Sequence, residues 1–131
     1  MNIQTFLKLY VISVPIFFVI DMIWLGFVAS NFYRERLGEL MQVSWGPAIA
    51  FYLVYLVGLM FFAVYPNLDK GWQMVLLYGA LFGFFTYATY DMTNYATLKD
   101  WPLDMVIVDI IWGTVLGASV AVVTYLVYGL L

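Results

Sequence analysis

The sequence predicts an all-α integral membrane protein, an antiparallel four-helix bundle, and three observations support this prediction. The chain of 131 residues is 66% hydrophobic and only 10% charged, whereas a soluble domain is about 25% charged. Four apolar stretches each reach or exceed the roughly 20 residues that a helix needs to cross a bilayer. Short polar segments separate these stretches, so consecutive helices should run in opposite directions. We therefore expect residues 1–131 to form a single transmembrane domain.

The predicted spans are residues 6–29, 46–65, 72–98 and 103–128. The first span is longer than the apolar core of a signal peptide, so we interpret it as a helix that stays in the membrane. Between the first two spans, residues 30–45 place Tyr33 and Leu37 on one helical face and most charges elsewhere. This pattern predicts a short amphipathic helix at the interface, with a solvated loop as the alternative. Residues 66–71 are rich in turn-forming residues and join the second and third spans.

The composition argues against several kinds of function. The chain has no Cys and no His, which excludes disulfides, thiolate nucleophiles and His-ligated zinc or haem. Five basic residues against eight acidic ones give a net charge of −3, and nucleic-acid binding needs a basic surface instead. We expect no metal, no cofactor and no nucleic-acid partner. The basic residues divide almost equally between the two sides, so the positive-inside rule does not predict an orientation.

Three aspartates are predicted to meet at one depth in the bundle. At 1.5 Å per residue, Asp21 lies about 12 Å inward from the end of its span, Asp91 about 10 Å and Asp109 about 9 Å. All three depths are measured from the same side of the membrane, because the first and third connections lie on that side. No Lys or Arg lies at this depth. Since a buried carboxylate without a cation is costly, we expect the three acids to hold or share protons.

Two further patterns support this convergence. Small residues recur every fourth position before Asp91 and after Asp109, and such stripes let membrane helices approach closely. The stripes are Gly79, Gly83, Tyr87 and Asp91 on the third span, and Asp109, Gly113, Gly117 and Ala121 on the fourth. In addition, Asp-Met-Ile-Trp at 21–24 resembles Asp-Ile-Ile-Trp at 109–112. A tryptophan three residues after an acid lies on the same helical face.

The acid layer is therefore the candidate functional site. We interpret Asp21, Asp91 and Asp109 as candidate catalytic acids, because acid catalysis needs carboxyls whose protonation the environment adjusts. Polar and aromatic residues at the same level are the candidate ligand-binding residues, and aromatic rings stabilise positive charge. These residues are Trp24, Tyr52, Tyr55, Tyr87, Thr93, Asn94 and Trp112. The alternative is a polar plug in which Thr93, Asn94 and the tyrosines only satisfy the acids and join the helices.

Residues 89–102 read Thr-Tyr-Asp-Met-Thr-Asn-Tyr-Ala-Thr-Leu-Lys-Asp-Trp-Pro, and residues 109–113 read Asp-Ile-Ile-Trp-Gly. Together they resemble a family of small bacterial membrane proteins, domain-of-unknown-function family 2177. The resemblance covers essentially the whole chain, including Asp21, Trp24 and Gly26 in the first span. It implies a multi-pass protein of the bacterial cytoplasmic (inner) membrane, and it implies no particular activity.

Three functions remain open. In the first, the acid layer binds a lipid or other hydrophobic small molecule, with or without acid catalysis on it, and membrane lipids are the expected partners. Alternatively, the protein is a small proton-coupled transporter of hydrophobic cations. Its length and the acid in its first span resemble the small multidrug-resistance transporters, which work as homodimers. A non-catalytic membrane interaction protein is the third reading. A Mg²⁺ site at Asp100 and Asp104 is disfavoured, because Pro102 breaks the helical register between them. We favour the first function.

Overall fold

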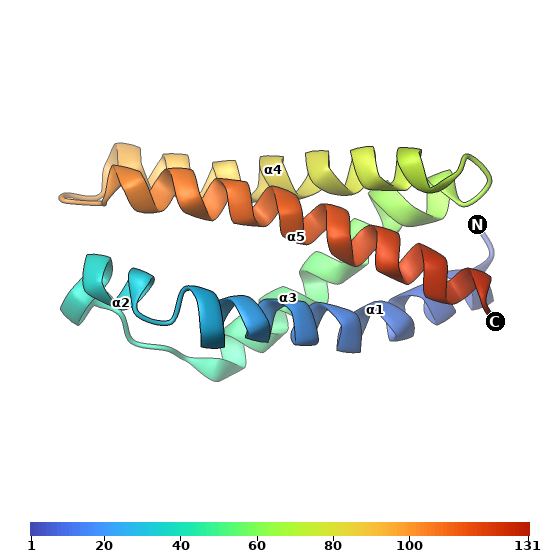
Figure 1. The fold of residues 1–131 in the computed structure, drawn as a ribbon, viewed down its shortest axis with the longest axis horizontal. Helices are drawn as coiled ribbons and strands as arrows, with labels where there is room; N and C mark the ends of the chain where they lie inside the picture. Colours follow the sequence, from blue (N-terminus) through green and yellow to red (C-terminus); the bar gives the residue numbers. More distant parts are fainter.

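The computed structural model describes residues 1–131 and is all-α. Its long helices are α1 (Ile3–Ile23), α3 (Trp45–Leu59), α4 (Trp72–Thr97) and α5 (Leu103–Gly129). Two of them continue into a π-helical turn, α1 into η1 (Trp24–Val28) and α3 into η3 (Met60–Val64), and the 3₁₀ turn η4 (Tyr65–Asn67) follows η3. These elements extend along the long axis of the molecule, with both chain termini at one end (Figure 1).

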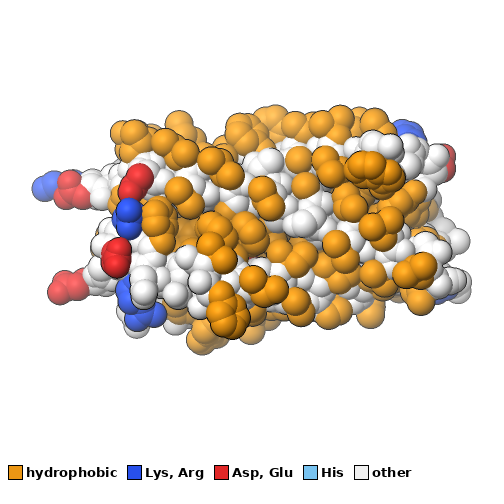
Figure 2. Space-filling view, in the orientation of Figure 1, with side chains coloured by type: hydrophobic (Ala, Val, Ile, Leu, Met, Phe, Trp, Pro, Cys, Tyr) orange, Lys and Arg blue, Asp and Glu red, His pale blue; other side chains and the backbone are white.

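Three continuous helical segments are long and apolar enough to cross a membrane, namely Ile3–Val28, Trp45–Asn67 and Leu103–Gly129. Helix α4 is similarly long but less apolar, because Gly, Thr, Tyr and Asn interrupt its aliphatic residues. Charged side chains gather at the two ends of the molecule, and apolar side chains cover the middle (Figure 2). Beyond the sixth residue of the four long helices, the only Asp, Glu, Lys or Arg side chains are those of Asp21, Asp91 and Asp109.

The connection between α1 and α3 differs from the prediction of one amphipathic helix. It contains the short helix α2 (Phe32–Leu37) and then a separate 3₁₀ turn, η2 (Gly38–Leu40). Gly38 has a φ of 54°, a conformation that ends a helix and that glycine adopts most readily. The amphipathic pattern therefore continues across two short elements rather than along one helix.

Helices α4 and α5 form a tight hairpin, as the two glycine stripes predicted (Figure 1). A Cβ atom placed on Gly79 would lie 2.6 Å from the carbonyl oxygen of Gly117. Gly83 and Gly113 face each other in the same way, so the residues pair in opposite order along the two helices. The two backbones touch where any side chain would separate them. This contact fixes the position of α4 relative to α5.

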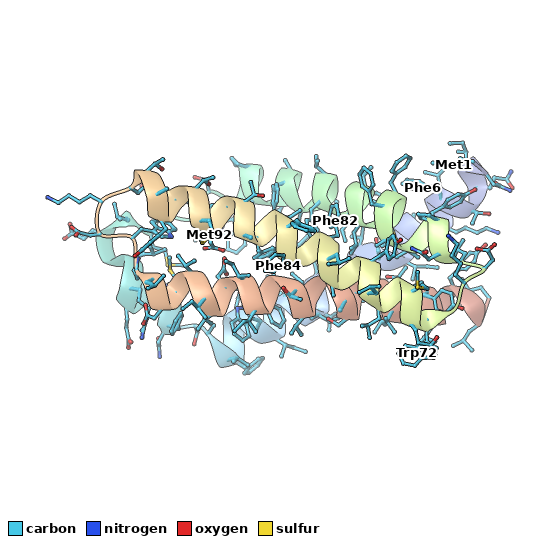
Figure 3. The ribbon with its side chains drawn as sticks, turned by 90° about the horizontal axis from the view of Figure 1, so that it is seen from above. Met1, Phe6, Trp72, Phe82, Phe84 and Met92 are labelled. Carbon is cyan, nitrogen blue, oxygen red and sulfur yellow. The ribbon has the colours of Figure 1, made fainter.

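Helix α3 has a different relation to α4. The backbone of α4 lies close to η3, and α3 then diverges from α4 toward the end that carries α2 (Figure 1). Phe82 extends from α4 toward α3 (Figure 3), and a Cβ atom on Gly58 would lie 2.7 Å from its ring. The apolar core lies in the half of the molecule away from α2 and includes Leu9, Phe17, Leu56, Leu59, Met60, Val64, Val75, Leu116 and Val120. The half nearer α2 is less completely filled.

Candidate functional site

A cavity of about 1010 Å³ occupies the space where α3 and α4 diverge. Side chains from all five α-helices, η1 and η3 line it, and most of these side chains are aromatic. The aromatic lining residues are Trp24, Tyr33, Phe51, Tyr52, Tyr55, Phe62, Phe82, Phe85, Tyr87, Tyr90 and Trp112. Two carboxyls, those of Asp21 and Asp109, also line the cavity. An apolar cavity with a few convergent polar groups is the usual form of a small-molecule site.

The cavity opens on the apolar side of the molecule. Seven of its lining residues are also exposed on the outer surface: Phe51 by 55%, Val54 by 68%, Phe62 by 60%, Phe85 by 61% and Tyr90 by 55%, together with Thr89 and Thr93. The first two belong to α3, Phe62 belongs to η3 and Phe85 belongs to α4. The opening therefore lies between α3 and α4, and it extends along α4 as far as Thr93, about one turn before the end of that helix.

Two stacked tryptophans connect the acids at the inner end of the cavity. The indole rings of Trp24 and Trp112 stack at 4.4 Å between centroids, with 5° between their planes. Trp112 Nε1 donates a long hydrogen bond of 3.4 Å to Asp21 Oδ1. Trp24 Nε1 donates to the Tyr33 hydroxyl at 3.0 Å, and this hydroxyl donates to Asp109 Oδ1 at 2.7 Å. Each tryptophan thus connects to the acid of the other helix. Trp112, which follows Asp109, bonds Asp21 directly, and Trp24, which follows Asp21, reaches Asp109 through Tyr33.

Tyr33 is a site residue that the sequence analysis did not identify. It belongs to α2, which folds over the end of the bundle, and its hydroxyl reaches α5. Burial, and then the nearby Asp109 carboxylate, raise the pKa of the Tyr33 hydroxyl well above its usual value. The hydroxyl therefore keeps its proton and acts as a hydrogen-bond donor to Asp109. Its position on the apolar face of residues 30–45 was the available sequence signal.

Asp91 lies beside the cavity rather than on its wall. Its side chain is fully buried on the face of α4 that packs against α5, and neither carboxyl oxygen has an N–H or O–H donor. The carboxyl of Asp109 is its neighbour. Two carboxyls can bond to each other only when one of them carries a proton. Asp91 is thus a buried acid that adjoins an acid facing the cavity.

The other predicted residues divide into two groups. Tyr52, Tyr55, Tyr87 and Thr93 line the cavity together with both tryptophans, and Asn94 does not. The Thr93 hydroxyl donates back to the carbonyl of Thr89 on its own helix. Neither Thr93 nor Asn94 supplies the acids with the hydrogen bonds that the polar-plug interpretation required, and the donors are Trp112 and Tyr33 instead.

Tyr55 places a buried hydroxyl at the wall of the cavity. Its side chain is only 4% exposed, and its hydroxyl has no hydrogen-bond partner. The nearby Thr86 donates its hydroxyl to the carbonyl oxygen of Phe82, 2.8 Å away. A buried hydroxyl without a partner is costly, so this position favours a bound polar atom.

No group of three or more acidic side chains is arranged so that it could hold a metal ion. No curated protein and no solved structure matches the chain. A family model described as "Predicted membrane protein (DUF2177)" matches residues 6–126, and this match confirms the resemblance seen in the sequence. The chain belongs to this predicted membrane protein family.

Proposed function

We propose that the protein binds one hydrophobic molecule, a lipid or a comparable small molecule, in the cavity between α3 and α4. The observation that carries this proposal is the large aromatic cavity that opens on the apolar surface and has Asp21 and Asp109 at its inner end. An apolar body fits the aromatic walls, and a polar or reactive group of the same molecule lies against the acids. The volume of about 1010 Å³ is at the upper end of the range for sites that bury a drug-sized ligand.

In this proposal α4 crosses the membrane as a fourth span. Its close packing against α5 supports this arrangement, because the two helices share a tight seam and their ends meet in one short turn. Four antiparallel spans then place the opening between α3 and α4 within the hydrocarbon layer. A hydrophobic molecule enters from the bilayer without crossing water.

Acid catalysis is the second candidate function, and the pairing of Asp91 with Asp109 favours it. Asp109 faces the cavity and can pass a proton to a bound unsaturated molecule. The proton moves from the carboxyl to one alkene carbon, and a carbon next to the resulting cation returns a proton to the carboxylate. The double bond thereby moves along the chain with no other reactant. The aromatic walls stabilise the intermediate positive charge.

A cavity-blocking variant tests the binding proposal. Ala48 lines the cavity, whereas Ala50 lies on the exposed surface of the same helix. Wild type, Ala48→Trp and Ala50→Trp are purified in mild detergent, and the small molecules that accompany each are identified by mass spectrometry. We expect one hydrophobic molecule to accompany wild type and Ala50→Trp, and we expect it to be absent from Ala48→Trp. The same bulk lipids with all three proteins would contradict the proposal.

The catalytic candidate needs its own comparison. Asp109→Asn keeps the shape of the side chain but cannot donate the proton. We expect the isomer that accumulates in wild type to be absent from the molecules that this variant still binds. An unchanged ratio of isomers would exclude acid catalysis and leave binding intact. Binding that instead drives uptake or release across a vesicle membrane would favour the transport alternative.

A further inference from the structure

The acids around the cavity have no cationic partner in the protein. Asp21 and Asp109 line the cavity, no Lys or Arg does, and Asp91 adjoins them in the buried layer. Arg36, a basic side chain of α2, already has a partner, because it bonds Asp104 at 2.9 Å at the end of the bundle. Compensation for charge in the acid layer must therefore come from protons or from a ligand.

The acids also have few hydrogen-bond donors. A carboxylate accepts about four hydrogen bonds, but Asp21 receives one long bond from Trp112, with the Tyr52 hydroxyl beside it, and Asp109 receives one from Tyr33. Both acids face the cavity, so the unused acceptor positions are accessible to a bound molecule. The unpartnered hydroxyl of Tyr55 adds an independent polar position in the same cavity. An ammonium group, with its N–H donors, complements the acids in both charge and hydrogen bonding.

Aromatic rings surround the same region. Tyr33 and Tyr52 line the cavity beside the two acids, and the stacked pair of Trp24 and Trp112 completes the wall. Ring faces attract cations, and the attraction grows when the cation loses water. The unpaired acids and the aromatic rings around the cavity therefore both favour a ligand that carries a positive charge.

We infer that the ligand of this cavity is a lipophilic amine, a molecule with an apolar body and one ammonium group that lies between Asp21 and Asp109. This inference rests on the proposed function, since it specifies the polar group of the molecule that the cavity binds. Phosphate and carboxylate head groups are disfavoured, because they would bring a like charge to the acids in a medium of low dielectric constant. An uncharged alcohol would leave the charge of the acids uncompensated.

A head-group series on the wild-type protein tests the inference. Dodecylamine, dodecanol and dodecanoate share one alkyl chain and differ in charge, and each is titrated into the protein in detergent at neutral pH. The near-ultraviolet circular dichroism of the stacked Trp24–Trp112 pair reports occupancy, because the pair forms the wall next to the acids. We expect saturable binding of dodecylamine about tenfold or more tighter than binding of either other probe.

Three variants locate the preference. Asp21→Asn and Asp109→Asn should each reduce the preference for the amine about tenfold, and Asp69→Asn, in the exposed turn before α4, should not change it. Tight binding of dodecanol or dodecanoate to wild type would overturn the inference and leave the proposed function standing. Failure of all three probes to bind would overturn both. The wild-type series remains decisive even where an asparagine variant does not fold.

Discussion

Helix α4 has two sides that pack in opposite ways. Toward α5 it presents Gly79 and Gly83, and the two backbones touch along a seam without side chains. Toward α3 it presents large rings such as Phe82 and Phe85, and the two helices separate around a cavity. The seam leads to Asp91 and its neighbour Asp109, and Asp109 also lines the cavity. Close packing on one side thus positions an acid for the open space on the other.

This difference shows how a small membrane protein can combine rigidity with a binding site. Lipid tails are as apolar as aliphatic side chains, so helices in a bilayer associate mainly through close packing and hydrogen bonds. The glycine seam supplies the close packing. Helix α3 contacts α4 mainly through η3 and through aromatic pairs such as Tyr55 and Phe82. The space between α3 and α4 is therefore free to form the cavity.

The largest expected effect comes from breaking the seam. In Gly117→Ala the new Cβ atom would meet the backbone of Gly79, which cannot rotate away. We expect a loss of about 3 kcal/mol in the free energy of unfolding, measured by denaturation in detergent. Gly129→Ala, on the same helix with open space around its Cβ position, is the matched control and should be near neutral. Equal stability of the two variants would show that the seam is not closely packed.

A smaller effect is expected where α2 covers the acid layer. Tyr33→Phe removes the hydroxyl that donates to Asp109 at 2.7 Å and accepts from Trp24. We expect a loss of about 1.5 kcal/mol in unfolding free energy and an altered near-ultraviolet signal from the tryptophan pair. Tyr78→Phe, at an exposed position on α4, serves as the control. Identical melting curves for Tyr33→Phe and Tyr78→Phe would show that the Tyr33 hydroxyl does not contribute to stability.

The smallest effect concerns the ion pair at the end of the bundle. Arg36 bonds Asp104 at 2.9 Å and links α2 to the start of α5, where both side chains are partly exposed to solvent. A double-mutant cycle with Arg36→Gln and Asp104→Asn should show a weak coupling that diminishes as salt is added. A coupling that does not change with salt would indicate that the pair is shielded from water.

The glycine seam and the proximity of the three acids could be predicted from the sequence, because both follow from helix geometry and from residues of distinct chemistry. Tyr33 could not be placed, since its inward direction depends on where α2 begins and on the turn at Gly38. The cavity could not be placed either. Phe51 and Phe85 line it, but an aromatic residue that faces a cavity has the same hydropathy as one that faces lipid.

The central claim is that the acid layer is reached from the hydrocarbon of the bilayer through the opening between α3 and α4. A variant that retains Trp24 and Trp112 and carries Phe at the other three tryptophans would be reconstituted into lipids with brominated acyl chains. Both retained rings line the cavity, so we predict strong quenching of their fluorescence by the brominated chains and weak quenching by acrylamide from water. Strong quenching by acrylamide with none from the lipid would contradict the account, because the cavity would then open to water.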